Sequence, residues 1–284
     1  MNKGVSSVKS LAGFLVISTL LAVGARAADV PAFSKVMVVF LENTDFKDAI
    51  AQPFMSQLAS DGAVLTNFIA EKHPSQSNYI AMISGDTFSV PGDGNVSLDG
   101  RHVGNLVEEA GKSWKVYAEG YPGSCFQGAR QGAYVRKHEP FISFKNVQSD
   151  PTRCARIVEA SALDTDIAAG QLPDFSLYIP DLNDDGHDTG VRFADKWLTK
   201  RFGPLLKDPR FMQNMLLIVT FDESHTPSPN LVYTALFGAH VKPGSQSATR
   251  LDHYSLLRTI ELGLGLQDLG KLDLKAVPVT GIWQ

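Results

Sequence analysis

The chain has 284 residues, of which 44% are hydrophobic and 20% charged. This is enough to bury a sizeable core, and it predicts one large α/β domain. Its 26 basic and 30 acidic residues give a net charge of −4, which argues against nucleic acid as a partner. A carboxylate-rich metal site would account for part of the acidic excess, and so would an ordinary soluble surface.

The first 27 residues have the pattern of a secretory signal peptide. Two lysines precede an apolar run over residues 11–23, and Ala25-Arg26-Ala27 is the pattern that a signal peptidase cuts. The run is too short to predict a membrane span. We therefore expect residues 28–284 to form a single domain that is periplasmic or secreted, without a stable membrane anchor. Removing the leader leaves 23 basic residues against 30 acidic ones, a net charge of −7.

Apolar runs along the chain predict strands buried in a largely parallel central sheet, with helices flanking it. The expected strands are 35–41, 63–68, 114–118, 175–180, 215–221 and 231–237. The expected helices are 53–60, 103–110, 191–206 and 254–262. Residues 119–150 are rich in Gly, Pro, Ser and aromatic residues without periodicity. They predict a long loop-rich excursion over one face of the sheet, and such loops are usually functional.

The two cysteines, Cys125 and Cys154, both lie in the part expected to be exported. An oxidising compartment favours one disulfide between them, pinning the loop-rich middle of the chain. Their spacing matches no metal-binding motif. Two free buried thiols are the alternative.

Acidic residues follow three of the expected strands, at Glu42, Asp181 and Asp222. Because the carboxyl ends of parallel strands share one sheet edge, where ligands bind, this pattern predicts one acidic cluster. Any one of these residues taken singly is an ordinary turn residue. Asp222 is followed by Glu223, however, and adjacent carboxylates repel unless a cation compensates them. A divalent metal is the natural partner, and further oxygen ligands would come from Glu42 and Asn43.

The segment from Lys72 to Tyr79 reads as a loop that ends in a helix, with Ser75 at the helix start. Free N–H groups and the helix dipole favour an anion there, so a phosphate would fit against the Ser75 hydroxyl. The alternative is an ordinary N-cap, for which serine is a preferred residue.

The loop over residues 181–188 holds a second group of candidate ligands. Asp181 and His187 form a plausible pair, with His253 as a remote third ligand. The calcium-loop pattern of an EF-hand is incomplete here, because the terminal glutamate is missing. We assign the other acidic residues of this loop to a solvated turn: Asp184, Asp185 and Asp188.

Five motifs occur in order along the chain, at residues 41–43, 73–79, 181–187, 220–223 and 252–261. Together they resemble the bacterial and fungal phosphoesterase family, a branch of the alkaline phosphatase superfamily. That family holds secreted acid phosphatases, phosphatidylinositol-3-phosphatase-like enzymes and phospholipases C. The resemblance implies an alkaline phosphatase-like fold.

The resemblance also implies catalytic roles. Ser75 corresponds to the nucleophile, with Ser77 as its competitor, and Asn78 would hold a phosphoryl oxygen. His138 lies in a segment similar to a His-x-Pro-Phe segment of the family, and it would protonate a leaving oxygen or bind phosphate. A surface histidine beside two basic residues is the alternative.

Metal ligands follow from the same resemblance. Four residues correspond to the metal site beside the nucleophile: Glu42, Asn43, Asp222 and Glu223. Three correspond to a second metal site, or to phosphate contacts and proton transfer if one metal suffices: Asp181, His187 and His253. We expect one or two divalent ions, of Zn, Mn, Mg or Ca. Glu223 replaces a usual histidine, and the resulting all-oxygen site favours a harder ion than zinc.

The expected function is metal-dependent hydrolysis of phosphate monoesters through a phosphoserine intermediate, with small-molecule or lipid phosphoesters as substrates. One alternative is a phosphodiesterase of phospholipase C type. Phospholipases in the family tend to be longer, so an end at Gln284 favours the monoesterase. A non-catalytic exported protein that binds metal or phosphate is the other alternative. A retained nucleophile beside a complete ligand set argues against it.

Overall fold

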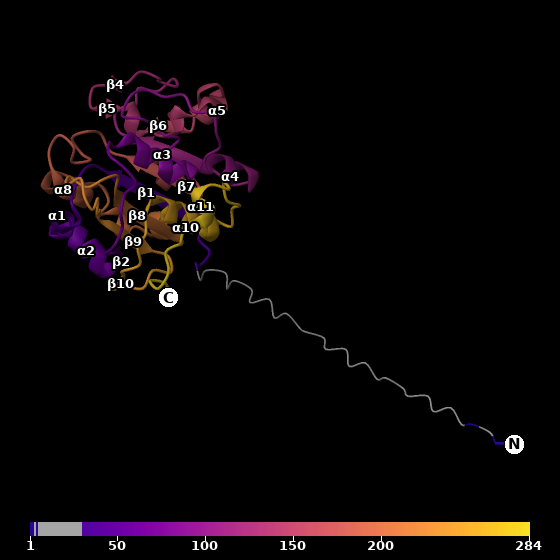
Figure 1. Ribbon diagram of the computed structural model, residues 1–284. Coiled ribbons are helices and arrows are strands. Elements are labelled where there is room, and N and C mark those ends of the chain that lie inside the picture. Colours follow the sequence, from indigo (N-terminus) through magenta and orange to yellow (C-terminus); the bar gives the residue numbers. More distant parts are fainter. Residues whose placement is uncertain (3, 5–29) are drawn as a thin grey trace.

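The computed structural model describes residues 1–2, 4 and 30–284 (Figure 1). The expected signal peptide lies, apart from three residues, outside this part of the chain. Among the described residues, no helix is long and apolar enough to cross a membrane. The α/β class and the central sheet expected from the sequence are both confirmed.

The molecule is built around an eight-stranded sheet in the order β10-β2-β9-β8-β1-β7-β3-β6. Strand β9 is antiparallel to both β2 and β8, whereas β1 is parallel to both β7 and β8. The sheet strands are β1 Lys35–Leu41, β2 Ala63–Leu65, β3 Trp114–Ala118, β6 Ile157–Glu159, β7 Phe175–Ile179, β8 Met215–Phe221, β9 Thr234–Gly238 and β10 Ser245–Ser247. A separate small hairpin pairs β4 Arg130–Gln131 with β5 Tyr134–Val135.

The central strands are buried on both faces, which explains their continuous apolar sequences. Every residue of β8 is buried, as is every residue of β1 after Lys35. A strand covered on both sides has no polar face, so it shows no alternation of polar and apolar residues. The expected bounds of β1, β3 and β8 match the structure at every residue.

Helices cover both faces of the sheet. In Figure 1, α3, α4, α10 and α11 lie together on one side of the sheet, and α1, α2 and α8 lie on the other. Helix α10 packs against α3, and α2 packs against α8. The helices are α1 Phe46–Ile50, α2 Pro53–Asp61, α3 Gln76–Ser84, α4 Val103–Glu109, α5 Lys145–Gln148, α6 Pro151–Cys154, α7 Ala162–Ala169, α8 Val191–Arg201, α9 Pro209–Met212, α10 His253–Leu264 and α11 Leu272–Lys275.

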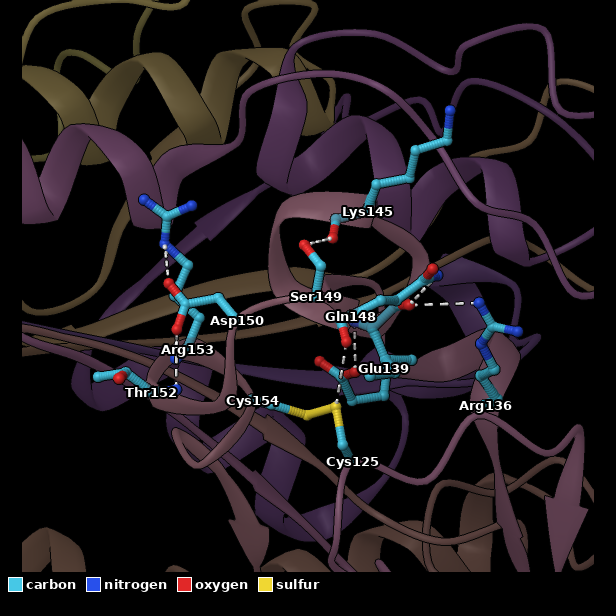
Figure 2. The surroundings of a disulfide bond; sticks show 11 residues. Cys125, Arg136, Glu139, Lys145, Gln148, Ser149, Asp150, Thr152, Arg153 and Cys154 are labelled. Atoms are coloured by element: carbon cyan, nitrogen blue, oxygen red, sulfur yellow. Dashed lines mark hydrogen bonds and ion pairs between the residues drawn. A yellow bond between two sulfur atoms is a disulfide. The ribbon is translucent and has the colours of Figure 1, made fainter.

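The excursion after β3 contains short elements that periodicity did not reveal: the β4-β5 hairpin, helix α5 and two 3₁₀ turns, η1 Arg136–His138 and η2 Phe141–Ser143. It lies at the top of the molecule in Figure 1. The expected disulfide joins Cys125 to Cys154, with Cα atoms 5.4 Å apart (Figure 2). It ties the excursion to α6, and Sγ of Cys125 lies 3.9 Å from the carbonyl oxygen of Gln148.

Candidate active site

The parallel pairing of β1 with its neighbours brings acidic residues together at one sheet edge. The N–H of Asp222, just beyond β8, donates to the carbonyl of Leu41 over 3.0 Å. The N–H of Glu42 donates to the carbonyl of Asp185 over 3.1 Å. Glu42 and Asp222 are fully buried, and Glu223 is 3% exposed. The sheet register therefore fixes three carboxylates in a site largely closed to bulk solvent.

Asn43 links these carboxylates. Its backbone N–H donates to Oδ1 of Asp222 over 3.2 Å, and its amide donates to Oε1 of Glu223 over 2.8 Å. The backbone φ of Asn43 is 25°, a left-handed conformation that asparagine tolerates better than most residues. The residue thus turns the chain sharply after β1 and orients two acidic side chains.

Ser75 stands at the N-terminus of α3, where its side chain makes no capping hydrogen bond. Its hydroxyl instead donates to Oε2 of Glu42 over 3.0 Å, and it lies 3.5 Å from Oε1 of Glu223. The hydroxyl of Ser77 donates to the carbonyl of Val90 over 3.2 Å. Of the two serines, Ser75 is therefore the one directed into the acidic cluster.

Asn78 braces the loop that presents Ser75. Its carbonyl oxygen accepts from the N–H groups of Glu71 and Lys72, and its amide donates to the carbonyl of Lys72 over 2.8 Å. The side chain is fully buried. The carbonyl oxygen and one N–H of the Asn78 amide are therefore engaged with the loop before α3. Its expected contact with a phosphoryl oxygen stays a prediction.

The carboxylate of Glu42 contacts two rings, those of Tyr79 and His138. The hydroxyl of Tyr79 donates to Oε1 of Glu42 over 2.7 Å, and Nε2 of His138 lies 3.1 Å from the same oxygen. The two rings stack with centroids 5.0 Å apart. Burial lowers the pKa of His138 to about 4, so its imidazole is neutral in the metal-free protein. His138 is 1% exposed and is not the surface histidine of the alternative interpretation.

Asp185 corrects the sequence analysis, which assigns it to a solvated turn. The residue is 1% exposed, and its Oδ2 lies 3.4 Å from Nδ1 of His138. Its Oδ1 accepts from the N–H of His187 over 2.7 Å. Burial raises the pKa of Asp185 to about 7. A row of contacts thus runs from Asp185 through His138 to Glu42.

The three residues expected at a second metal site are not brought together. His253 is fully buried, with Nδ1 2.5 Å from Oε2 of Glu71 and Nε2 3.1 Å from the carbonyl oxygen of Phe221. Both nitrogens are engaged, so neither offers a lone pair to a metal. His187 is half-exposed, with Nδ1 2.7 Å from Oδ1 of Asp188.

Asp181 belongs to a different acidic group, with Glu119 and Asp184, whose ligand atoms lie within 4.8 Å of one another. This group could hold a cation, although the Glu119 carboxylate and Oδ1 of Asp181 already accept hydrogen bonds. Glu119 accepts from the hydroxyl of Tyr178 over 2.8 Å and from the indole of Trp197 over 3.2 Å.

The cluster beside Ser75 fits a divalent cation better. Oδ1 of Asn43 and Oδ2 of Asp222 are buried without a hydrogen-bond partner among the described residues. Burial and the charges of Glu42 and Glu223 raise the pKa of Asp222 well above its ordinary value, and burial raises the pKa of Glu223 to about 7. Orphaned oxygens and mutually repelling carboxylates are the features that a bound cation relieves.

A cavity of about 510 Å³ lies beside Asn43. Its lining residues include Thr44, Asp48, Gly190, His187 and His225. Asn43 is the one residue of the cluster that lines this cavity, so the cavity adjoins the site at Asn43.

Comparisons with known proteins agree with this geometry. A model of the phosphoesterase family matches residues 45–267. The chain belongs to that family. It is 36% identical over 255 residues to a probable acid phosphatase of Kluyveromyces lactis, covering 85% of this chain and 61% of that protein. It is 34% identical over 267 residues to a phosphatidylinositol-3-phosphatase of Mycobacterium tuberculosis, covering 92% of this chain and 86% of that protein.

Two further comparisons bear on length and fold. The match to an acid phosphatase of Aspergillus fumigatus, at 34% identity, covers 86% of this chain and 58% of that protein. The chain thus spans about three fifths of the length of the fungal family members it matches. A protein in the alkaline phosphatase superfamily from Vibrio parahaemolyticus superposes with a TM-score of 0.62 at 12% identity, over 89% of this chain and 72% of that one. The fold is that of this superfamily.

The sequence predicted no role for Tyr79 or Glu71, and it placed Asp185 in a solvated turn. Tyr79 could have been found, because it lies one helical turn after Ser75 and shares its helix face. Glu71 and Asp185 had no such signal, since their roles depend on contacts between distant loops. Oε2 of Glu223 also lies 2.8 Å from Nδ1 of His73, a residue far from it in the sequence.

Proposed function

We propose that this family member hydrolyses phosphate monoesters through a covalent phosphoserine at Ser75, with a divalent cation as cofactor. The observation that carries the proposal is the direction of the Ser75 hydroxyl, which points at Glu42 instead of capping its own helix. The orphaned oxygens of Asn43 and Asp222 beside it support a cation site. The acid phosphatases and the phosphatidylinositol-3-phosphatase among the relatives support phosphate monoesters, phosphoinositides included, as the substrate class.

The cation would be held by four residues of the cluster: Glu42, Asn43, Asp222 and Glu223. Once bound, it would favour the ionised form of a nearby hydroxyl and offset negative charge on the phosphoryl group. Asp181, His187 and His253 lie outside this ligand set, so the proposed site holds one cation.

The chemical steps use the contacts of Ser75. Its proton leaves along the hydrogen bond to Glu42 while Oγ attacks phosphorus. The Oγ–P bond forms as the bond from phosphorus to the leaving oxygen breaks. His187, which lines the adjoining cavity, gives a proton to that oxygen, so an alcohol departs.

Hydrolysis of the phosphoserine then restores the site. A water molecule attacks phosphorus, and its proton passes to His187. The Oγ–P bond breaks, the serine oxygen regains its proton from Glu42, and phosphate leaves. His138 and Asp185 act as positioning residues in this scheme, because they contact Glu42 and each other and are closed to solvent.

Turnover of p-nitrophenyl phosphate tests the proposal. We expect activity to need a divalent cation and to vanish with chelator. Ser75→Ala should lose at least about 1,000-fold in kcat, whereas the matched Ser77→Ala should keep activity within about 5-fold. Phosphoserine trapped by acid quench should map by mass spectrometry to Ser75. Full activity of Ser75→Ala would overturn the assignment, and phosphate binding without turnover in any metal would favour a binding protein.

The same assay separates the monoesterase from a phosphodiesterase. We expect p-nitrophenyl phosphate to be cleaved faster than phosphatidylcholine. The opposite preference would move the proposal to a phospholipase C-type reaction.

We also propose that the protein is exported, as a periplasmic or secreted enzyme. The Ala25-Arg26-Ala27 pattern and the disulfide support this location. Amino-terminal sequencing of protein isolated from the producing cell should give Ala28 as the first residue. A mature protein that still begins at Met1 would contradict the proposal.

A further inference from the structure

A lysine that neither the sequence motifs nor the proposed mechanism uses lies at the acidic cluster. Lys137 is in the 3₁₀ turn η1, directly before His138. Its Nζ lies 2.8 Å from Oδ2 of Asp93, and its side chain is 19% exposed. A partly buried pair near the surface contributes at most about 1 kcal/mol to stability. A contribution to stability therefore does not explain why this lysine lies beside the candidate active site.

The ammonium of Lys137 lies one residue from a contact of the acidic cluster, because the next residue, His138, has its Nε2 3.1 Å from Oε1 of Glu42. Burial opposes its charge, but the hydrogen bond to Asp93 and the charge of Glu42 outweigh this effect and raise the pKa of Lys137, so it stays protonated. At Glu223, burial and the charge of Asp93 raise the pKa, whereas the hydrogen bond from Asn43 and the charge of Lys137 lower it. The charges of Lys137 and of its partner Asp93 therefore both act at the acidic cluster.

Asp93 joins this ammonium to the helix that carries Ser75. Its Oδ1 accepts from the N–H of Gln76, the first residue of α3, over 3.1 Å. One carboxylate therefore contacts both a helix N-terminal N–H and an ammonium, the two kinds of donor that bind phosphoryl oxygens. The side-chain amide of Gln76 is itself 1% exposed and has no hydrogen-bond partner among residues 30–284.

Building on the proposed function, we propose that Lys137 binds a non-bridging oxygen of the substrate's phosphoryl group, and that Asp93 holds its ammonium in position. A phosphate monoester carries two negative charges near neutral pH, whereas a diester carries one. A fixed ammonium stabilises the bound dianion more than the monoanion. Lys137 is therefore the residue that makes the site prefer monoesters to diesters.

The test compares Lys137→Met and Lys137→Arg in the metal-loaded full-length protein, with p-nitrophenyl phosphate and bis-p-nitrophenyl phosphate as substrates. For Lys137→Met we expect kcat/KM to fall about 100-fold on the monoester and less than about 5-fold on the diester. Lys137→Arg should retain most of the preference. Lys112→Met is the matched control, because Lys112 forms a comparably exposed pair with Asp174 over 3.8 Å. It should leave both rates unchanged.

A second arm reads out binding without turnover. Titration calorimetry with inorganic phosphate should show at least about 10-fold weaker binding to Lys137→Met than to the parent protein. Asp93→Asn keeps an acceptor for the N–H of Gln76 but removes a negative charge. We expect it to bind phosphate at least as tightly as the parent, while kcat falls about 5-fold because the ammonium is no longer held.

The outcomes are distinguishable from failure of the proposed function. If the parent protein turns over no phosphoester, the proposed phosphatase activity is rejected. The assignment of Lys137 still holds in that case if Lys137→Met binds phosphate more weakly than the parent protein does. Equal losses on both esters, or unchanged phosphate affinity in a folded Lys137→Met protein, would overturn the role of Lys137. Equal weakening of kcat and phosphate binding in Asp93→Asn would assign Asp93 a merely structural role.

Discussion

The hydroxyl of Tyr79 donates a 2.7 Å hydrogen bond to Oε1 of Glu42, while the other oxygen of that carboxylate accepts from Ser75. Ser75 directly precedes α3 and Tyr79 lies in its first turn, and together they hold a buried carboxylate at the end of β1 in one orientation. A carboxylate ligand fixed in this way does not have to be ordered when the metal binds.

Tyr79→Phe should therefore weaken cation binding. Removal of the hydroxyl leaves Oε1 of Glu42 with His138 as its remaining contact, and we expect the dissociation constant for the cation to rise about 10-fold. Tyr134→Phe is the matched control, because the Tyr134 hydroxyl is buried without a hydrogen-bond partner among the described residues. Calorimetric titration of the metal-free variants measures the effect. Equal changes in the two variants would contradict it.

Stability in the absence of metal should fall as pH rises. Burial raises the pKa values of Glu139, Asp185 and Glu223 to about 7, above about 4 in an unfolded chain. Between these values the folded state binds more protons than the unfolded state, so the free energy of unfolding decreases with pH, by on the order of 3 kcal/mol for each group. Thermal unfolding in chelator from pH 5 to pH 8 should show a falling Tm.

The cation should reverse this trend, because it binds the deprotonated carboxylates. We expect the rise in Tm on adding Mn²⁺ or Mg²⁺ to be larger at pH 8 than at pH 5. Asp185→Asn should flatten the metal-free profile. A metal-free Tm that rises steadily across the same window would show that these carboxyl groups are ionised in the folded protein.

Substitution of His253 should lower the stability of the protein without changing its metal content. Burial opposes its protonation, but the charge of Glu71 dominates and raises the pKa of His253, so a buried ion pair holds the start of α10. His253→Gln breaks this pair and should cost about 3 kcal/mol in the free energy of unfolding. Elemental analysis should still find one cation per chain. A folded His253→Gln variant that binds no metal would show that His253 is a metal ligand.

Loss of the disulfide should destabilise the whole domain. Cys125 and Cys154 are 29 residues apart, and opening a loop of this length should cost about 3 kcal/mol. Urea unfolding of the Cys125→Ser, Cys154→Ser double variant, compared with the parent with and without reductant, measures the loss. Because the loop contains Lys137 and His138, kcat should fall as well. Unchanged stability would mean that packing alone fixes the excursion.

Much of the fold could be predicted from the sequence because its determinants are local. A strand buried on both faces needs a continuous apolar run, so β1 and β8 were visible without any knowledge of their neighbours. Polar residues directly after such strands, Glu42 and Asp222, indicated one functional edge, since parallel strands end together. The bounds of these elements and the positions of these carboxylates were fixed by the sequence itself.

Only the tertiary structure decided which side chains meet at that edge. A Ser75 hydroxyl looks the same in sequence whether it caps a helix or faces a carboxylate, and its orientation depends on Glu42, 33 residues away. Asp185 was assigned to a solvated turn because burial by another segment leaves no local signal. His253 moved from the ligand set into an ion pair with Glu71, 182 residues away, because hydrogen-bond partners are set by packing and not by spacing.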